Sequence, residues 1–142
     1  MVALLLQLQP QLPADFELIP DIDVDLQLAP PGAPGTVRRP DLVIVGRDAR
    51  QRVRSDGGLL RAADLIVIIE IVSSGSRRID RIVKRAEYAD AGIDHYWIVD
   101  IDAQATLTAH RLAGTDYRVE APATGRYTAD APFGVDLDLA GF

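Results

Sequence analysis

Two apolar runs dominate the hydrophobic pattern of the chain, and both predict buried strands. They cover residues 42–45 and 65–72 and are rich in β-branched side chains, which favour strands over helices. The second run is apolar at odd and even positions alike, which is typical of a central strand whose two faces are both covered. Glu70 interrupts this run. Its carboxylate must be neutralised, paired or bound to a metal, because a bare buried charge is costly.

The pattern before the second run predicts several smaller elements. Residues 2–8 resemble the start of a helix, and residues 22–28 alternate apolar and polar side chains, as a half-buried strand does. Proline and glycine in residues 29–35 indicate a loop. Residues 47–61 are polar and contain Asp56-Gly57-Gly58. This segment is therefore expected to be either a flexible basic arm or a long hairpin loop.

The pattern after residue 72 predicts a crossover between two parallel strands. Residues 73–76 supply N-cap candidates, residues 77–91 have a helical pattern, and Gly92 stands where a left-handed residue ends a helix. The next strand is expected over residues 95–100. Strand, helix and strand in this order predict a right-handed βαβ unit. Further strands, expected to be antiparallel additions, are predicted over residues 106–111, 117–120 and 135–139.

Length and composition indicate one globular domain. The chain has 142 residues and a hydrophobic content of 48%, enough for a core that buries roughly 65–70% of the surface of the unfolded chain. There is no cysteine, so disulfides and thiolate metal sites are excluded and a reducing cytoplasm is the expected location. The apolar stretch 3–6 follows no basic residue, which argues against a secretory signal, and no segment approaches the length of a membrane span.

Charge is distributed unevenly along the chain. Residues 38–85 hold twelve Lys or Arg against six Asp or Glu, whereas the remainder holds three against fifteen. If this positive block folds around Glu70, it would suit a phosphodiester such as the DNA backbone. The alternative is an ordinary solvated face. The candidate nucleic-acid contacts are Arg47, Arg50, Arg52, Arg54, Arg77, Arg78 and Arg81.

Asp41 is the predicted partner of Glu70. It opens the strand over residues 42–45, so two neighbouring strands could bring an aspartate and a glutamate together as hard oxygen ligands for a divalent cation. The alternative is a buried ion pair of Glu70 with Arg77 or Arg78, a kind of pair that apolar residues often replace without loss of stability. A carboxylate kept at this position is therefore interpreted as functional.

The helix predicted after Glu70 carries the only lysine of the chain. Asp80, Lys84 and Tyr88 are spaced four residues apart and lie on one stripe. An ammonium group beside the carboxylates could help to activate water, with Asp80 and Tyr88 as supporting residues. The alternative is a surface ion pair of Asp80 with Lys84. The apolar contacts of this helix are expected from Ile79, Ile82, Val83 and Ala86.

Other candidate metal sites lack the spacing that their chemistry requires. Residues 21–25 begin like a calcium-binding loop, but Leu26 and Gly32 stand where such a loop has glycine and glutamate. His95 and His110 are too isolated in the sequence for a zinc site. Both histidines are expected to be ordinary strand residues.

Four motifs carry a resemblance to a known family. They are Pro40-Asp41, Glu70-Ile71-Val72-Ser73-Ser74, residues 77–84 and residues 87–100. In this order they resemble the Uma-two family of restriction-endonuclease-type proteins, in the PD-(D/E)xK superfamily. The resemblance implies an α/β (α+β) fold: a restriction-endonuclease-like core with a mixed central sheet, a βαβ crossover, flanking helices and extra antiparallel strands. It also implies one domain over residues 1–142 that is short at its N-terminus compared with relatives.

The same resemblance implies a set of site residues. Asp41, Glu70 and the backbone carbonyl of Ile71 would coordinate Mg²⁺, or Mn²⁺ in its place, for hydrolysis of DNA. The superfamily usually has its lysine two residues after the glutamate, where this chain has Val72. Lys84 on the following helix is expected to take over that role. Restriction-like cores commonly pair, so a homodimer is expected.

Three hypotheses follow for function. The first is a magnesium-dependent DNA endonuclease with Asp41, Glu70 and Lys84 as its catalytic residues. The second is a catalytically degenerate relative that acts as a nucleic-acid or protein interaction module, with DNA binding that is sensitive to salt but no metal-dependent turnover. The third is a dimeric structural protein with Glu70 in an internal ion pair, which predicts neither metal nor DNA binding.

Overall fold

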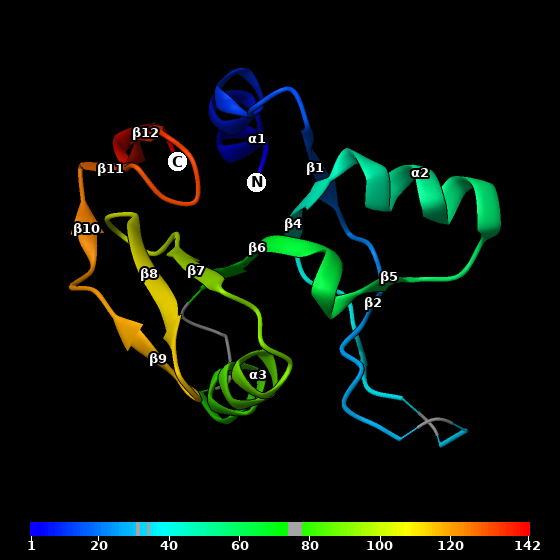
Figure 1. Ribbon diagram of the computed structural model, residues 1–142. Helices are drawn as coiled ribbons and strands as arrows, with labels where there is room; N and C mark the ends of the chain where they lie inside the picture. The colour runs from blue at the N-terminus through cyan, green and yellow to red at the C-terminus, as the bar shows by residue number, and fades with distance from the viewer. Residues whose placement is uncertain (31, 34, 74–77) are drawn as a thin grey trace.

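A mixed seven-stranded sheet forms the centre of the computed structural model (Figure 1). The structure describes residues 1–30, 32–33, 35–73 and 78–142, and of residues 78–80 it describes the backbone alone. The strand order is β1-β4-β6-β7-β8-β10, and β9 also pairs with β8. β6 and β7 are parallel, and the other pairs of this sheet are antiparallel. The strands are β1 (Phe16–Pro20), β4 (Leu42–Gly46), β6 (Leu65–Val72), β7 (His95–Asp100), β8 (Thr106–Ala113), β9 (Asp116–Val119) and β10 (Ala123–Thr124).

Two smaller sheets and three α-helices surround this sheet in the described residues. One has three strands, β2 (Val24–Asp25), β3 (Val37–Arg38) and β5 (Leu60–Arg61). The other is a two-stranded hairpin of β11 (Arg126–Ala129) and β12 (Val135–Asp138). The α-helices are α1 (Val2–Leu8), α2 (Arg47–Asp56) and α3 (Arg78–Asp90), and 3₁₀ turns cover Gln9–Gln11, Ala62–Asp64 and Leu139–Gly141. None of the described helices is long and apolar enough to cross a membrane.

The crossover predicted after residue 72 is present. β6 and β7 are parallel neighbours with Glu70 beside Ile98, and α3 connects them. Gly92 has a φ of 77°, the left-handed conformation predicted for the residue that ends this helix. The N-cap candidates at residues 74–76, like Arg77, lie outside the described residues. The observed architecture agrees with the mixed, restriction-endonuclease-like fold that the sequence predicts.

The central sheet is apolar on both faces, as the pattern of β6 predicts. Ile69 lies with Leu42 and Ile44 in a core cluster that α1 and the hairpin of β11 and β12 cover. Ile68 lies with Val43 in a second cluster, which includes side chains of α3. Figure 1 shows the two layers, with α1 and the hairpin above the sheet and α3 below it.

The segment over residues 47–61 is neither an arm nor a loop, because α2 occupies its first ten residues. Ala49 and Val53, one helical turn apart, pack against the second core cluster. Asp48 lies in the first turn, where a negative charge is favourable, and Gly57 ends the helix with a φ of 76°. Two apolar residues are enough to pack this helix against the core. A segment with so few apolar residues shows no clear helical pattern in the sequence.

One predicted strand is much shorter in the structure, and β1 is an observed strand that the pattern does not predict. In place of a strand over residues 22–28, β2 covers two residues only. Gln27 has a left-handed φ of 57°, and its N–H bonds the carboxylate of Asp25 at 2.9 Å, which stops the ladder. β1 was not predicted, because Leu18 and Ile19 point to opposite faces and are both buried. An alternating pattern therefore does not appear in β1.

α3 turns a different face to the sheet than its apolar residues predict. Tyr88 is fully buried and donates a hydrogen bond to Glu70. A buried carboxylate needs such donors, and this requirement outweighs the burial of aliphatic side chains on one helix. The predicted contacts are therefore wrong where they can be assessed: Ile82, Val83 and Ala86 are exposed, the first two by 58% and 41%, and the side chain of Ile79 lies outside the described part.

Candidate functional site

Asp41 and Glu70 lie on neighbouring strands and on one face of the sheet. β4 and β6 are antiparallel with Leu42 beside Ile69, so Asp41, the residue before β4, lies beside Glu70. Side chains alternate along a strand, and Glu70 therefore shares the face of Ile68, toward α3. The structure thus brings together the two carboxylates that the sequence analysis singled out.

Backbone contacts hold Asp41 in place. Its Oδ2 accepts a hydrogen bond from the N–H of Ile71 at 2.7 Å, and its carbonyl accepts one from the N–H of Asp21 at 3.1 Å. The N–H and the C=O of one strand residue point to the same edge. The carbonyl of Ile71 therefore points to the same side of β6 as its N–H, toward Asp41, as the expected ligand set requires.

Glu70 is buried beside two donors from α3. It is 6% exposed, and its Oε1 accepts a hydrogen bond from the hydroxyl of Tyr88 at 2.7 Å. The Nζ of Lys84 lies 3.7 Å from the same oxygen, and the Lys84 side chain is 24% exposed. Lys84 therefore contacts the buried carboxylate and solvent at once.

The surroundings of Glu70 disfavour its charge. Burial raises the pKa of Glu70 above its usual value, and the nearby Asp41 raises it further, while the Tyr88 hydrogen bond and the charge of Lys84 act in the opposite direction. Burial and the charge of Glu70 also raise the pKa of Tyr88, so its hydroxyl remains a donor. Two carboxylates thus lie close together, and Tyr88 and Lys84 do not fully offset the effects of burial and Asp41 on the pKa of Glu70.

The donor set fits a hard divalent cation. One oxygen of each carboxylate, Oδ2 of Asp41 and Oε1 of Glu70, is occupied by a protein donor. Among the described residues, no other N–H or hydroxyl group donates to either carboxylate, whereas a hydrogen bond between the two carboxyl groups contributes to the raised pKa of Glu70. Mg²⁺ is typically held by one or two carboxylates and keeps several waters. No group of three His, Cys, Asp or Glu side chains suited to a metal occurs in the described part, so further ligands would be waters, phosphate oxygens or the Ile71 carbonyl.

An ion pair that the sequence analysis missed ties α3 to the strand before Asp41. The guanidinium of Arg38 contacts both carboxylate oxygens of Glu87, at 2.6 and 2.8 Å. Arg38 lies three residues before Asp41, and Glu87 precedes Tyr88. The pair is 49 residues apart in the sequence, so no local spacing indicates it. The predicted Asp80 contact with Lys84 stays a prediction, because the side chain of Asp80 is not described.

The predicted nucleic-acid contacts on α2 do not gather around the carboxylates. Arg47 follows the last residue of β4 and Asp41 precedes the first, so the strand separates them by roughly 20 Å. Arg52 pairs with Asp64 at 2.6 Å and Arg54 lies 3.7 Å from Glu17. Among the other predicted contacts, Arg47, Arg50 and Arg81 form no ion pair with a described residue, and Arg77 and the side chain of Arg78 lie outside the description.

Acidic residues from elsewhere neutralise much of the positive block at residues 38–85. Six of its twelve basic residues take part in described ion pairs. Four of the six acidic partners lie outside the block, at Glu17, Asp23, Glu87 and Asp116. The surplus of positive charge along the sequence therefore does not become an equally large free basic surface in the described part.

Both histidines are strand residues, as predicted. His95 belongs to β7 and is half-buried, and burial lowers its pKa below the usual value. His110 belongs to β8 and is 4% exposed, and its Nδ1 lies 3.1 Å from the carbonyl oxygen of Tyr96. Neither takes part in a described group of metal-type ligands.

Comparison with known proteins adds one finding. The model of the Uma2 family, described as "Putative restriction endonuclease", matches residues 2–140. No curated protein matches the chain. The matched range includes both carboxylates, the crossover and the added antiparallel strands.

Proposed function

The chain belongs to the Uma2 family, and from this premise we propose that it is a magnesium-dependent endonuclease that hydrolyses phosphodiester bonds of DNA. The observation that carries the proposal is the carboxylate pair: Asp41 and Glu70, from neighbouring strands, each have one oxygen held by a protein donor, and among the described residues the other oxygen has no such N–H or hydroxyl donor. Lys84 lies beside this pair. The family description supports a nuclease, and the donor set supports the metal.

The roles of the residues follow from their chemistry. A magnesium ion bound at the pair would polarise the scissile phosphate and lower the pKa of a bound water. Asp41 and Glu70 would hold it through their second oxygens, together with the carbonyl of Ile71. The hydrogen bond from Ile71 N–H keeps Asp41 from rotating, and burial keeps bulk water away from Glu70. Mn²⁺ prefers similar oxygen ligands and should replace magnesium.

Lys84 is proposed as the residue that acts on the reacting groups. Its Nζ is 3.7 Å from Oε1 of Glu70 and its side chain reaches solvent. An ammonium group in this place can orient the attacking water or stabilise charge that develops on the phosphate oxygens. It stands on α3, whereas the strand position two residues after Glu70 is occupied by Val72, which is 6% exposed.

Contacts with the DNA backbone are proposed for the arginines that keep their charge available. Arg47, Arg50 and Arg81 have no ion-pair partner among the described residues, in contrast to Arg52 and Arg54. Contacts of this kind neutralise phosphates and carry no sequence information. The proposal therefore concerns DNA as a polyanion.

Nicking of supercoiled plasmid DNA tests the proposal, together with calorimetric titration of Mg²⁺ and Mn²⁺. The wild type should bind the metal and nick the plasmid only in its presence. Glu70→Gln should lose both properties, since the amide keeps the shape of the side chain but not its charge. Asp136→Asn, which alters a half-exposed carboxylate paired with Arg126, is the matched control. Cleavage that persists in Glu70→Gln would remove the assignment.

The extent of internal ion pairing favours one alternative, a catalytically degenerate interaction module. Half of the basic residues between 38 and 85 are engaged by acidic partners in the described part. DNA binding that weakens steeply with salt, without metal-dependent nicking, would select this alternative. The homodimer expected from the resemblance stays a prediction, and the mass of the particle in solution checks it.

A further inference from the structure

We infer that Tyr88 is a positioning residue for the proposed metal centre: its hydroxyl holds Oε1 of Glu70 so that Oε2 is presented to the cation. The inference rests on the proposed function, because it assigns Tyr88 a task within that site. Tyr88 would not touch the metal or the substrate, and it would act only through the orientation of the carboxylate.

The contact geometry separates Tyr88 from Lys84. Both meet the same oxygen of Glu70, but the Tyr88 hydroxyl is 2.7 Å away and the Lys84 nitrogen 3.7 Å. Only the first distance is that of a strong hydrogen bond. Tyr88 has no exposed surface, whereas Lys84 is 24% exposed. Lys84 therefore lies on the solvent side of the carboxylate, while Tyr88 holds the carboxylate from the protein interior.

The surroundings of Tyr88 make it a rigid support. Its ring packs edge-on against Tyr96, with centroids 5.1 Å apart at 79°. Tyr96 packs in turn against His110 and Tyr117, at 5.0 and 5.9 Å. The neighbouring residue on α3, Glu87, is clamped by Arg38. A buried side chain that is held by a ring contact and a hydrogen bond can keep its partner within the narrow range of geometries that a metal ligand needs.

Loss of the hydroxyl should free the carboxylate to move. A glutamate has three rotatable side-chain bonds. Of the two described donors beside Oε1 of Glu70, only Lys84 would then remain, 1.0 Å further away than the hydroxyl was. A buried acceptor without its hydrogen bond is costly. The carboxylate would therefore turn toward Lys84 and away from the position that the cation requires. The effect should appear in metal affinity, which a merely structural role would leave unchanged.

Tyr88→Phe tests this inference, with Tyr117→Phe as the matched control. The Tyr117 hydroxyl donates to the carbonyl of Ile93 at 2.7 Å and is buried, so both variants lose one buried hydrogen bond of the same length. Mn²⁺ affinity, measured by calorimetry on the protein without DNA, should fall about tenfold or more in Tyr88→Phe and stay within about twofold in Tyr117→Phe. Thermal unfolding should shift by similar amounts in the two variants.

The outcomes distinguish this inference from the proposed function. If the wild type binds no Mn²⁺, the proposed function fails, and the inference fails with it. If the wild type binds and Tyr88→Phe binds equally well, only the role of Tyr88 is overturned. A fall of equal size in Tyr117→Phe would also overturn it, since the loss would then be one of general stability.

A measurement on the wild type covers the case in which Tyr88→Phe does not fold. Titration with Mg²⁺, followed by the aromatic ring signals in NMR, should shift Tyr88 and leave Tyr127 in place. Tyr127 lies on the other face of the sheet, packed against Trp97 at 5.7 Å. A saturating titration that leaves the Tyr88 signals unmoved would overturn the inference.

Discussion

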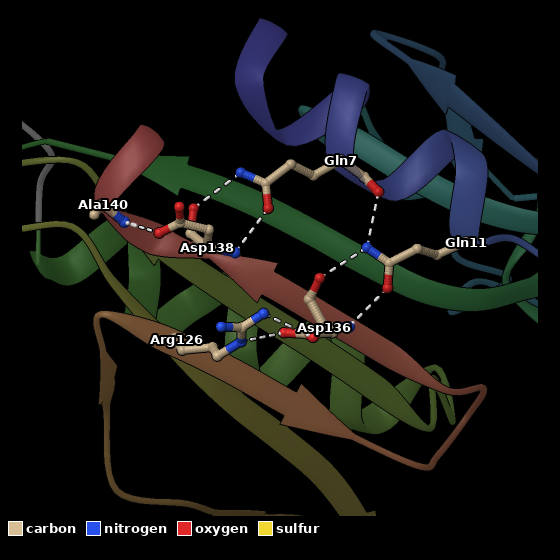
Figure 2. A network of polar contacts seen from close by, with 6 residues as sticks. All are labelled: Gln7, Gln11, Arg126, Asp136, Asp138 and Ala140. Carbon is tan, nitrogen blue, oxygen red and sulfur yellow. Dashed lines mark hydrogen bonds and ion pairs between the residues drawn. The ribbon is translucent and has the colours of Figure 1, made fainter.

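Two junctions between a helix and a strand use the same spacing in this protein with opposite results. On one face of the sheet, Lys84 and Tyr88 of α3, four residues apart, meet a single oxygen of Glu70. On the other face, Gln7 of α1 and Gln11 of the turn after it, also four residues apart, bond separate residues of β12 (Figure 2). The first junction gathers polar groups on one charge, and the second distributes them over neutral backbone.

The glutamine junction behaves like an added strand. Gln7 donates to the carbonyl of Asp138 at 2.9 Å and accepts from its N–H at 2.7 Å. Gln11 donates to the carbonyl of Asp136 at 2.8 Å and accepts from its N–H at 2.7 Å. Two residues of a strand span about 6.8 Å, close to the roughly 6 Å rise over four residues of a helix. The side-chain amides therefore complete the edge of β12 that β11 leaves unpaired.

The difference predicts how stability and the proposed function are divided between the two faces. The glutamine amides are neutral and satisfy both backbone groups of each strand residue, so the contact stabilises the fold. Burial and the nearby Asp41 raise the pKa of Glu70 more than Tyr88 and Lys84 lower it, so the charged carboxylate is unfavourable for stability. Changes at the α3 junction should therefore affect activity first, and changes at the glutamine junction should affect stability first.

Glu70→Gln should have the largest effect and should separate the two properties. Metal-dependent nicking should fall by about three orders of magnitude, while the melting temperature should stay the same or rise, since a buried charge is removed and the amide oxygen can still accept from Tyr88. Initial nicking rates and calorimetric unfolding measure the two effects. A lower melting temperature with retained nicking would reverse the comparison between the faces.

Lys84→Met should have the next largest effect. The nicking rate should fall about a hundredfold, because a charged donor beside the reacting groups is lost, while Mn²⁺ affinity should fall far less than in Glu70→Gln. Single-turnover rates at saturating metal measure the loss. Lys84→Arg, which keeps the charge, is the control. Equal losses in both variants would show that the shape of the lysine side chain matters and that its charge alone is not sufficient.

Removal of both glutamine side chains should lower stability and leave the metal site intact. In Gln7→Ala with Gln11→Ala, the free energy of unfolding should fall by about 2–3 kcal/mol, since four hydrogen bonds to backbone are lost at a discount for their partial exposure. Urea unfolding measures this change. Gln9→Ala, an exposed glutamine of the same segment, is the control. A clear fall in Mn²⁺ affinity would show that the two faces are not independent.

The pH dependence of stability should show the smallest effect, and it tests the aromatic layer behind α3. Burial, followed by the charge of Arg85, lowers the pKa of His110 below its usual 6.5. The unfolded imidazole takes up a proton before the folded one, so stability falls as the pH drops below about 6.5, by at most about 1.4 kcal/mol per pH unit. Urea unfolding at several pH values measures the slope. His110→Gln should reduce the slope of the unfolding free energy against pH. An unchanged slope would show that other groups cause it, and His95→Gln measures the contribution of the second histidine.

Particular residues show how far the sequence predicts this fold and site. The bounds of α1 and β6 agree with the pattern, and the sequence predicts Asp41 as the partner of Glu70. The register that places both on one face, with Leu42 beside Ile69, belongs to the tertiary structure. The face that α3 buries could not be predicted, because its exposed aliphatic residues suggest the opposite orientation. α2 was missed because only Ala49 and Val53 contact the core.

The sequence by itself determined which residues of each strand and helix share a face, since the repeats of two and of about 3.6 residues are local properties of the backbone. It thereby determined that a carboxylate must be buried in the central strand. Only the tertiary structure decided what surrounds that carboxylate. Contacts such as Arg38 with Glu87, or Gln7 with Asp138, join segments 49 and 131 residues apart. They form because the whole chain minimises unsatisfied polar groups and exposed apolar surface together, a balance that no local pattern contains.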